Sequence, residues 1–174
     1  RLPLGLLDTW DDGRRTHLFS QPLNGSGLAG GEARDLMPGL DADVAAGDGD
    51  FTLSRDGKAL IYSTQKQGAG EPFTNNSDLY RVTLDGGAPV NLTEANKGAD
   101  GNPAFSPDGR RLAWLASPRE NVGGDQAVVM LADASGANAR QLTNWDRGPS
   151  GLTWRSDGRA LYVTASDEGQ KRLF

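Results

Sequence analysis

Three segments of the sequence repeat one pattern at intervals of roughly 50 residues. Each segment has an apolar strand, an Asp-Gly pair followed by Lys or Arg, and then a second apolar strand. The segments align without gaps and comprise Phe51 to Gln65, Pro103 to Ser117 and Leu152 to Ser166. A period of this length predicts repeated supersecondary units that bury their faces against one another.

The Asp-Gly pairs predict tight turns. They begin at Asp56, Asp108 and Asp157. Glycine takes a positive φ without steric cost, and aspartate tolerates the left-handed region and bonds to nearby backbone. In the middle copy, Pro107 adds a fixed φ that suits the first corner of a turn. We therefore expect each copy to be a β-hairpin.

Two columns of the alignment are predicted to be buried. One contains Leu53, Phe105 and Trp154, and the other contains Leu60, Leu112 and Leu161. The residues after each turn are apolar on both faces of the strand, as in Leu112-Ala113-Trp114-Leu115. This pattern is typical of strands covered on both sides by neighbouring sheets.

A second hairpin follows each first one and completes a four-stranded unit. These hairpins comprise Asp78 to Leu84 with Val90 to Thr93, and Ala127 to Asp133 with Arg140 to Thr143. Upstream, the last three strands of an earlier unit are expected at Thr16 to Leu23, Asn24 to Gly31 and Ala33 to Leu36. The 24 glycines fit many turns between short strands. The predicted fold is an all-β propeller of four-stranded antiparallel blades.

Three to four blades are expected, at about residues 1–40, 51–93, 103–143 and 152–174, the last one incomplete. A closed propeller has about four to eight blades, so this number leaves the ring incomplete. The chain begins with Arg1 and shows no leader segment. We therefore expect a fragment of a larger protein.

Composition excludes several classes of function. The net charge is −5 and the basic residues are scattered, so nucleic acid is not an expected partner. No apolar run approaches the roughly 20 residues of a membrane helix, so no membrane partner is expected. The absence of cysteine excludes disulfides and thiolate metal sites but leaves the compartment open.

Sequence motifs support a resemblance to one family. The repeat Phe105-Ser106-Pro107-Asp108-Gly109-Arg110-Arg111-Leu112-Ala113-Trp114 resembles the blade signature of the Tol-system periplasmic propeller and of prolyl oligopeptidase-family serine peptidases. The stretch Asp8 to Phe19 looks like a blade of bacterial dipeptidyl-peptidase and acylaminoacyl-peptidase relatives in that family. The blade endings Asn91-Leu92-Thr93 and Gln141-Leu142-Thr143 fit as well, whereas Leu36-Met37 departs from the usual Leu-Thr.

The resemblance implies a propeller ahead of an α/β-hydrolase domain whose Ser, Asp and His act on peptides, with none of the three in this chain. The expected role is to cap the active site and admit only short peptides. Its partners would then be a peptide substrate and the chain's own hydrolase domain, in a periplasmic or secreted protein. The alternative is a Tol-system-like binding propeller without enzymatic activity. The oligomeric state and the preferred peptide bond stay open.

No catalytic residue is predicted in the chain. The Gly-x-Ser-x-Gly elbow of a serine hydrolase is absent. His17 is the only histidine, and a single imidazole without an assigned nucleophile is not a catalytic site. We expect it at the surface or in a turn.

No cofactor and no metal are predicted. Gly25-Ser26-Gly27-Leu28-Ala29-Gly30 matches a dinucleotide fingerprint, but no helical pattern follows it, so a hairpin loop is favoured. The acidic run from Asp41 to Asp50 could suggest calcium. It lacks the spacing and closing Glu of an EF-hand, so a solvated loop between blades is preferred.

Three asparagines begin glycosylation sequons, and four tryptophans could mark a substrate face. The sequons start at Asn24, Asn75 and Asn91 and are expected to remain bare. Trp114 and Trp154 lie in repeat columns and are expected to pack between blades. Trp10 is assigned to neither a packed nor an exposed position. Trp145, in a loop before Pro149, is the better candidate for an exposed contact.

Overall fold

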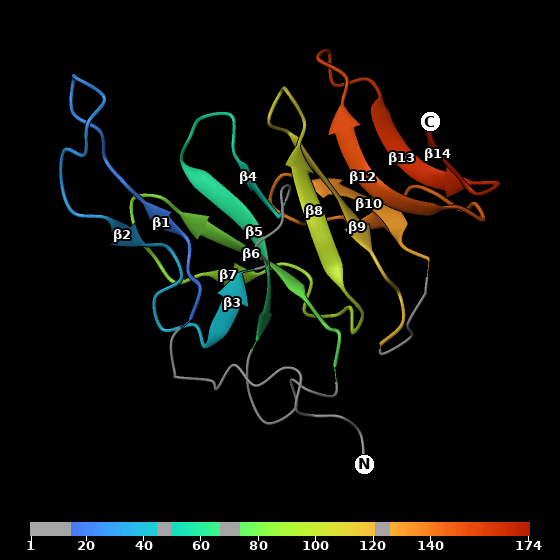
Figure 1. Ribbon diagram of the computed structural model, residues 1–174, viewed down its shortest axis with the longest axis horizontal. Coiled ribbons are helices and arrows are strands. Elements are labelled where there is room, and N and C mark those ends of the chain that lie inside the picture. Colours follow the sequence, from blue (N-terminus) through green and yellow to red (C-terminus); the bar gives the residue numbers. More distant parts are fainter. Residues whose placement is uncertain (1–14, 45–49, 67–73, 121–125) are drawn as a thin grey trace.

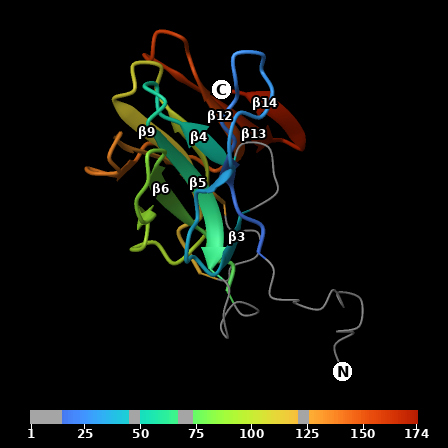
Figure 2. The same cartoon turned by 90° about the vertical axis from the view of Figure 1, so that its left-hand side faces the viewer.

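The computed structural model describes residues 15–44, 50–66, 74–120 and 126–174. These residues form strands and turns and contain no helix. The strands make four antiparallel sheets that lie next to one another in chain order (Figures 1 and 2). None of the described sheets is closed on itself.

We number the sheets I to IV along the chain. Sheet I pairs β1 (Phe19–Ser20) with β2 (Arg34–Asp35). Sheet II contains β3 (Ala42–Val44), β4 (Phe51–Leu53), β5 (Ala59–Lys66), β6 (Asp78–Thr83) and β7 (Val90–Asn91). Sheet III contains β8 (Asp100–Phe105), β9 (Arg111–Ala116), β10 (Val128–Asp133) and β11 (Arg140–Gln141). Sheet IV contains β12 (Gly148–Trp154), β13 (Leu161–Asp167) and β14 (Gln170–Leu173).

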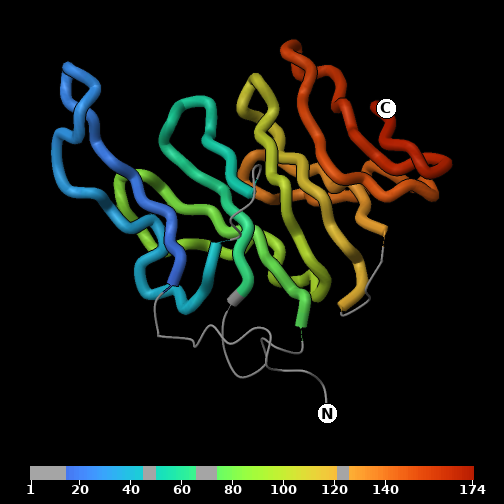
Figure 3. The backbone as a smooth tube through the Cα atoms, viewed as in Figure 1, coloured from blue at the N-terminus to red at the C-terminus, as the bar shows by residue number. Residues whose placement is uncertain are grey.

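The predicted Asp-Gly hairpins are confirmed, and their tips lie along one edge of the molecule (Figure 3). Only the glycine of each pair takes a positive φ, with values of 67° at Gly57, 71° at Gly109 and 69° at Gly158. The aspartate acts through its side chain, which accepts a hydrogen bond from the backbone N–H two residues later. At Asp157 the Arg155 guanidinium also donates to the carboxylate, and this lowers the pKa of Asp157 to about 2.

The apolar core is divided among the three junctions between neighbouring sheets. Tyr62 and Met37 are fully buried between sheets I and II, and Ile61 packs with Trp114 between sheets II and III. Val129 and Val163 pack between sheets III and IV. The sheets are therefore stacked face to face, as the sequence predicts.

An arginine spans each junction and donates to a carbonyl oxygen of the neighbouring sheet or its turn. Arg34 donates to Leu84 at 3.0 Å. Arg55 donates to Pro107 at 2.8 Å, and Arg111 donates to Gly158. These contacts fix the position of each sheet relative to the next.

One predicted core position is wrong. Leu53 is 52% exposed, whereas Leu60 opposite it is buried and Phe105 and Trp154 of the same column are partly buried. Leu53 lies on the face of sheet II that is turned toward sheet I. The described part of sheet I is a two-stranded ribbon, which covers Leu60 but leaves Leu53 in solvent.

The unusual Leu36-Met37 ending occupies the same place as the Leu-Thr endings. The N–H of Leu79 donates to the hydroxyl of Thr93 at 2.9 Å. At the corresponding place, the N–H of Leu18 donates to the sulfur of Met37 at 3.4 Å. The register of this segment is therefore the same as in the later repeats, with a buried thioether in place of the hydroxyl.

Two details near the start of the chain differ from the predictions. The Thr16 to Leu36 segment forms two strands, not three, because its glycine-rich part is the hairpin that joins them. The acidic run does not form only a loop, since Ala42–Val44 is strand β3 and pairs with β5. Residues 45–49 of that run lie outside the described residues.

Replacing Tyr62 with phenylalanine is expected to leave the free energy of unfolding unchanged or raise it by up to about 1 kcal/mol. The Tyr62 hydroxyl is buried and has no hydrogen-bond partner among the described residues, so its desolvation is uncompensated. Tyr80→Phe is the matched control, because Tyr80 stacks on Tyr62 but its hydroxyl accepts from Asn91 at 3.3 Å. In urea denaturation, Tyr62→Phe should have a higher free energy of unfolding than Tyr80→Phe. The reverse order would contradict this account.

Candidate functional site

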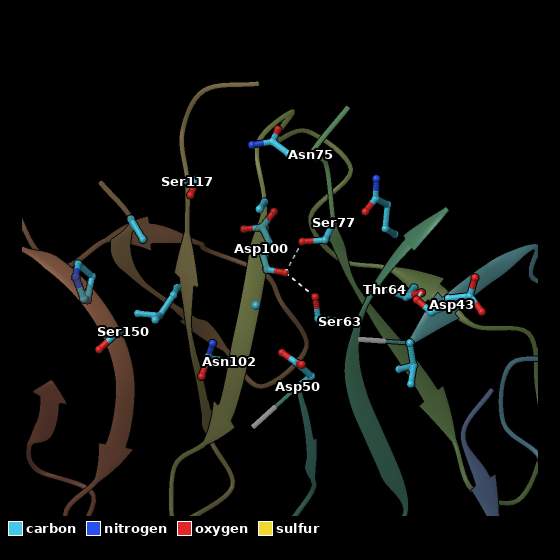
Figure 4. Close-up of a pocket in the computed structure, with 17 residues that line it drawn as sticks. Asp43, Asp50, Ser63, Thr64, Asn75, Ser77, Asp100, Asn102, Ser117 and Ser150 are labelled. Carbon is cyan, nitrogen blue, oxygen red and sulfur yellow. Dashed lines mark hydrogen bonds between the residues drawn. The ribbon is translucent and has the colours of Figure 1, made fainter. Parts of the chain in front are cut away.

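A polar cavity of about 540 Å³ opens along the free edges of sheets II, III and IV. Its lining comes from β3, β5, β8, β9, β12 and segments next to them, with Ala127 from just before β10. Asp43, Asp50 and Ser63 belong to sheet II, and Asn102 and Ser150 belong to sheets III and IV (Figure 4). Carboxylate, amide and hydroxyl groups therefore converge from three sheets on one space.

The edge strands lose their regular pairing at this cavity. On β8 the register shifts between Gly101 and Ala104, and on β12 it shifts between Pro149 and Gly151. In sheet II, β3 pairs with β5 up to Val44 and β4 pairs with β5 from Phe51, and the Asp50 carbonyl oxygen accepts from the Ser63 N–H at 2.8 Å, which continues the β4 register. Asn102 and Ser150 occupy the two register shifts.

Asp100 forms the wall between sheets II and III and is 1% exposed. Its carboxylate accepts from the Trp114 indole at 2.8 Å and from the Asn96 amide at 3.0 Å. Its carbonyl oxygen accepts from the hydroxyls of Ser63 at 2.6 Å and Ser77 at 3.0 Å (Figure 4). One residue therefore connects both sheets and the segment between them.

Burial raises the pKa of Asp100 to about 6, against the hydrogen bonds from Asn96 and Trp114 that lower it. The folded state then binds more protons than the unfolded state between the unfolded pKa of about 3.9 and the folded value. The carboxyl therefore contributes stability that is fully present below about pH 4 and lost as the pH rises through 6. Acidification should strengthen this junction.

Asp100→Asn should remove that pH dependence. We expect the wild type to gain about 2 kcal/mol relative to Asp100→Asn when the pH falls from 7.5 to 4.5. Urea unfolding at the two pH values measures the difference, with Asp85→Asn as an exposed control. A constant difference between wild type and Asp100→Asn would show that Asp100 does not titrate in this range.

The described residues that line the cavity include three ionisable side chains, Asp43, Asp50 and Asp100, and no histidine, lysine or arginine. Within the described ranges, no group of three or more His, Cys, Asp or Glu residues could hold a metal ion. Across the same ranges, no helix is long and apolar enough to span a membrane.

Several side chains singled out in the sequence lie away from the cavity. His17 is partly buried rather than at the surface, with Nδ1 2.9 Å from an Asp35 carboxylate oxygen and Nε2 3.2 Å from the Leu40 carbonyl oxygen. The Gly25–Gly30 stretch is the predicted hairpin loop and leads into no helix. The opening stretch, with Trp10, lies largely outside the described residues.

The three tryptophans in the described part of the chain pack between sheets. Trp114 is buried, and Trp154 donates to the Ala104 carbonyl at 3.1 Å beneath the Arg111 guanidinium, so both predictions are confirmed. Trp145, the better candidate for an exposed contact, does not make one. It is partly buried at the junction of sheets III and IV, with Phe174 packed edge-on at 5.1 Å.

The Asn91 sequon has a structural use. Its amide nitrogen donates to Asp78 at 2.7 Å, and its oxygen accepts from the Thr93 N–H at 2.9 Å. A glycan on this nitrogen would break the first contact. Asn24 is exposed and accepts from the N–H groups of Ser26 and Leu28, which shapes the hairpin loop.

Asn102 and Ser150 were not singled out by the sequence, whereas Asp43 and Asp50 lie in the acidic run that was considered for calcium. Asp50 and Asn102 both lie six residues before the aspartate of their Asp-Gly turns, and Ser150 lies seven residues before its own. Pro103 and Pro149 were the available signal, since proline within a strand indicates an edge strand or a bulge.

The stacked antiparallel sheets define a portion of a β-propeller, and solved structures share this fold. The chain superposes on puromycin hydrolase with a TM-score of 0.65 and 22% identity, covering 91% of this chain and 25% of that one. It superposes on TolB from Acinetobacter baumannii with a TM-score of 0.62 and 16% identity, covering 90% and 34%. These likenesses establish the fold alone.

Sequence similarity identifies the relatives more narrowly. The chain is 36% identical over 140 residues to dipeptidyl-peptidase 5 of Trichophyton equinum, and 33% identical over 139 residues to that of Arthroderma otae. Each match covers 74% of this chain and 19% of the relative. No family model matches the chain. The chain is therefore a propeller portion homologous to one segment of a peptidase, and it spans about a fifth of that relative's length.

Proposed function

We propose that this chain is the non-catalytic propeller portion of a serine peptidase of the dipeptidyl- or acylaminoacyl-peptidase type. The observation that carries the proposal is the 36% identity to dipeptidyl-peptidase 5 across 74% of the chain. The parent protein would add an α/β-hydrolase domain, which is this portion's partner, and would act on peptides. The blades would lie at about residues 1–40, 51–93, 103–143 and 152–174.

The proposed role is steric. The arginine contacts at the three junctions and the Asp100 connections favour a rigid stack of sheets. A rigid cover over a hydrolase would leave narrow entries, so short peptides would pass and folded proteins would not. The cover would contribute shape and polarity, not reacting groups.

Sequence favours this role over a Tol-system-like binding propeller. The TM-scores for puromycin hydrolase and TolB are nearly equal, so shape does not separate the two functions. Sequence identity does separate them, because it is 36% for dipeptidyl-peptidase 5 and 16% for TolB. The resemblance also favours a periplasmic or secreted parent, which fractionation of the producing cells would test.

The test uses the complete reading frame that encodes this chain. The purified product should react with a fluorophosphonate serine probe and release dipeptides from peptide substrates. The same peptide should be cut much more slowly when it is embedded in a folded carrier protein, and unfolding the carrier should restore cleavage. A product with no reactive serine and no peptidase activity would overturn the proposal, and equal cleavage of folded and unfolded carriers would overturn the steric role.

A further inference from the structure

The geometry of the inner cavity points to a binding site. We propose that it holds a lysine or arginine side chain of an extended peptide, with Asp50, Asn102 and Ser150 as the contact residues. The identification of the ligand as a peptide rests on the proposed function. The position and polarity of the site rest on the structure alone.

Two of the three contact residues, Asn102 and Ser150, are positioned by irregularities of the edge strands. An extra residue in a strand locally redirects side chains, and such bulges concentrate near binding sites. Asn102 lies in the β8 irregularity with φ at 51°, which is uncommon for a residue other than glycine. Ser150 lies in the β12 irregularity, and Asp50 directly precedes β4 (Figure 4). A carboxylate, an amide and a hydroxyl from three sheets therefore line one cavity, and the Ser150 hydroxyl also lies 3.4 Å from the Thr164 carbonyl oxygen.

The lining favours a positively charged group with several hydrogen-bond donors. Its described ionisable side chains, Asp43, Asp50 and Asp100, are all acidic, and its amides and hydroxyls add further acceptor oxygens. An ammonium or guanidinium would find acceptors from three directions, whereas a carboxylate would be repelled.

The cavity is wide enough for such a group and its walls are fixed. A volume of about 540 Å³ lies in the range of ordinary ligand pockets. The hydroxyls of Ser63 and Ser77 both donate to the Asp100 carbonyl, which holds the wall between sheets II and III in place. Little side-chain ordering would then accompany binding.

Calorimetry on the 174-residue chain tests the site with blocked peptides. The probes are acetyl-Gly-Gly-Lys-Gly-Gly-amide, its Arg version and its Glu version. We expect the Lys and Arg peptides to bind at least about tenfold more tightly than the Glu peptide, and added salt to weaken them. Asp50→Asn should weaken Lys binding about three- to fivefold. Asn102→Gly, which keeps the positive φ, and Ser150→Ala should each weaken it by a smaller factor.

Asp85→Asn is the matched control and should bind like wild type, because Asp85 is exposed at the turn after β6. Urea midpoints establish that each variant is folded. Equal affinity for the Lys and Glu peptides, or unchanged binding in Asp50→Asn, would overturn the proposal. So would a Glu peptide that binds equally well once its α-amine is unblocked, because the ligand would then be the amino terminus.

The complete protein separates this inference from the proposed function. There Asp50→Asn should raise KM for Lys-containing peptides while kcat stays constant. Peptidase activity with an unchanged KM in Asp50→Asn would overturn the proposed binding site but not the proposed function. Absence of any peptidase activity would overturn the proposed function, and the calorimetry would still test the binding site.

Discussion

Gly98→Ala is expected to lower the free energy of unfolding by at least about 3 kcal/mol. Gly98 is buried in the segment that leads into β8, and a Cβ there would lie 2.0 Å from the carbonyl oxygen of Ser117 and 3.0 Å from that of Arg119. Both obstacles are backbone atoms, so no rotation of a side chain relieves the overlap. Chemical denaturation of the 174-residue chain measures the loss.

Gly148→Ala provides the matched control. Gly148 begins β12, its φ is not positive, and a Cβ there would meet no atom within 4 Å. The substitution should change stability by less than about 1 kcal/mol. Similar losses in the two variants would mean that the close approach of Gly98 to Ser117 does not exist in solution.

Asp100→Ala is expected to cost about 3 to 5 kcal/mol. The truncation leaves the buried indole N–H of Trp114 without its acceptor and removes one of the two acceptors of the Asn96 amide, which still donates to the Ser117 carbonyl oxygen. It also leaves a void at the junction of sheets II and III. Asp100→Asn keeps one acceptor oxygen and the side-chain volume, so it should cost clearly less at neutral pH.

A double-mutant cycle isolates the indole contact. Trp114→Phe alone removes the donor, and in the Asp100→Ala background it should cost much less than in the wild type, because the interaction is already lost. The Trp114 fluorescence of Asp100→Ala should also change in the folded state. Strict additivity of the two substitutions would show that the Trp114–Asp100 hydrogen bond contributes nothing to stability.

The hairpins and their stacking were predictable because they depend on local sequence. An Asp-Gly pair needs only its own turn, in which Gly109 takes the positive φ and Asp108 accepts the N–H of Arg110. Strands that are apolar on both faces require cover on both sides wherever they lie. These rules carry no information about distant partners, and none was needed to predict the sheets.

The candidate site depends on partners far apart in the chain. Asp100 contacts Ser63 in one sheet and Trp114 in another. Neither the residue type nor the local pattern of apolar and polar residues around Asp100 indicates these contacts. The shifts at Asn102 and Ser150 depend on how each edge strand pairs, which a repeat alignment without gaps hides. Exposure of Leu53 likewise depends on how many strands the neighbouring sheet provides.

The division of the core among three junctions makes the energetics of this chain nearly one-dimensional. Each apolar cluster contains residues of two adjacent sheets only. A destabilising substitution at Met37 therefore weakens the interface between sheets I and II, whereas one at Val163 weakens the interface between sheets III and IV. Their effects should sum independently, whereas two changes within one cluster should not. The sequence of one sheet can therefore change without affecting distant sheets, because its side chains have to pack only against the two sheets beside it.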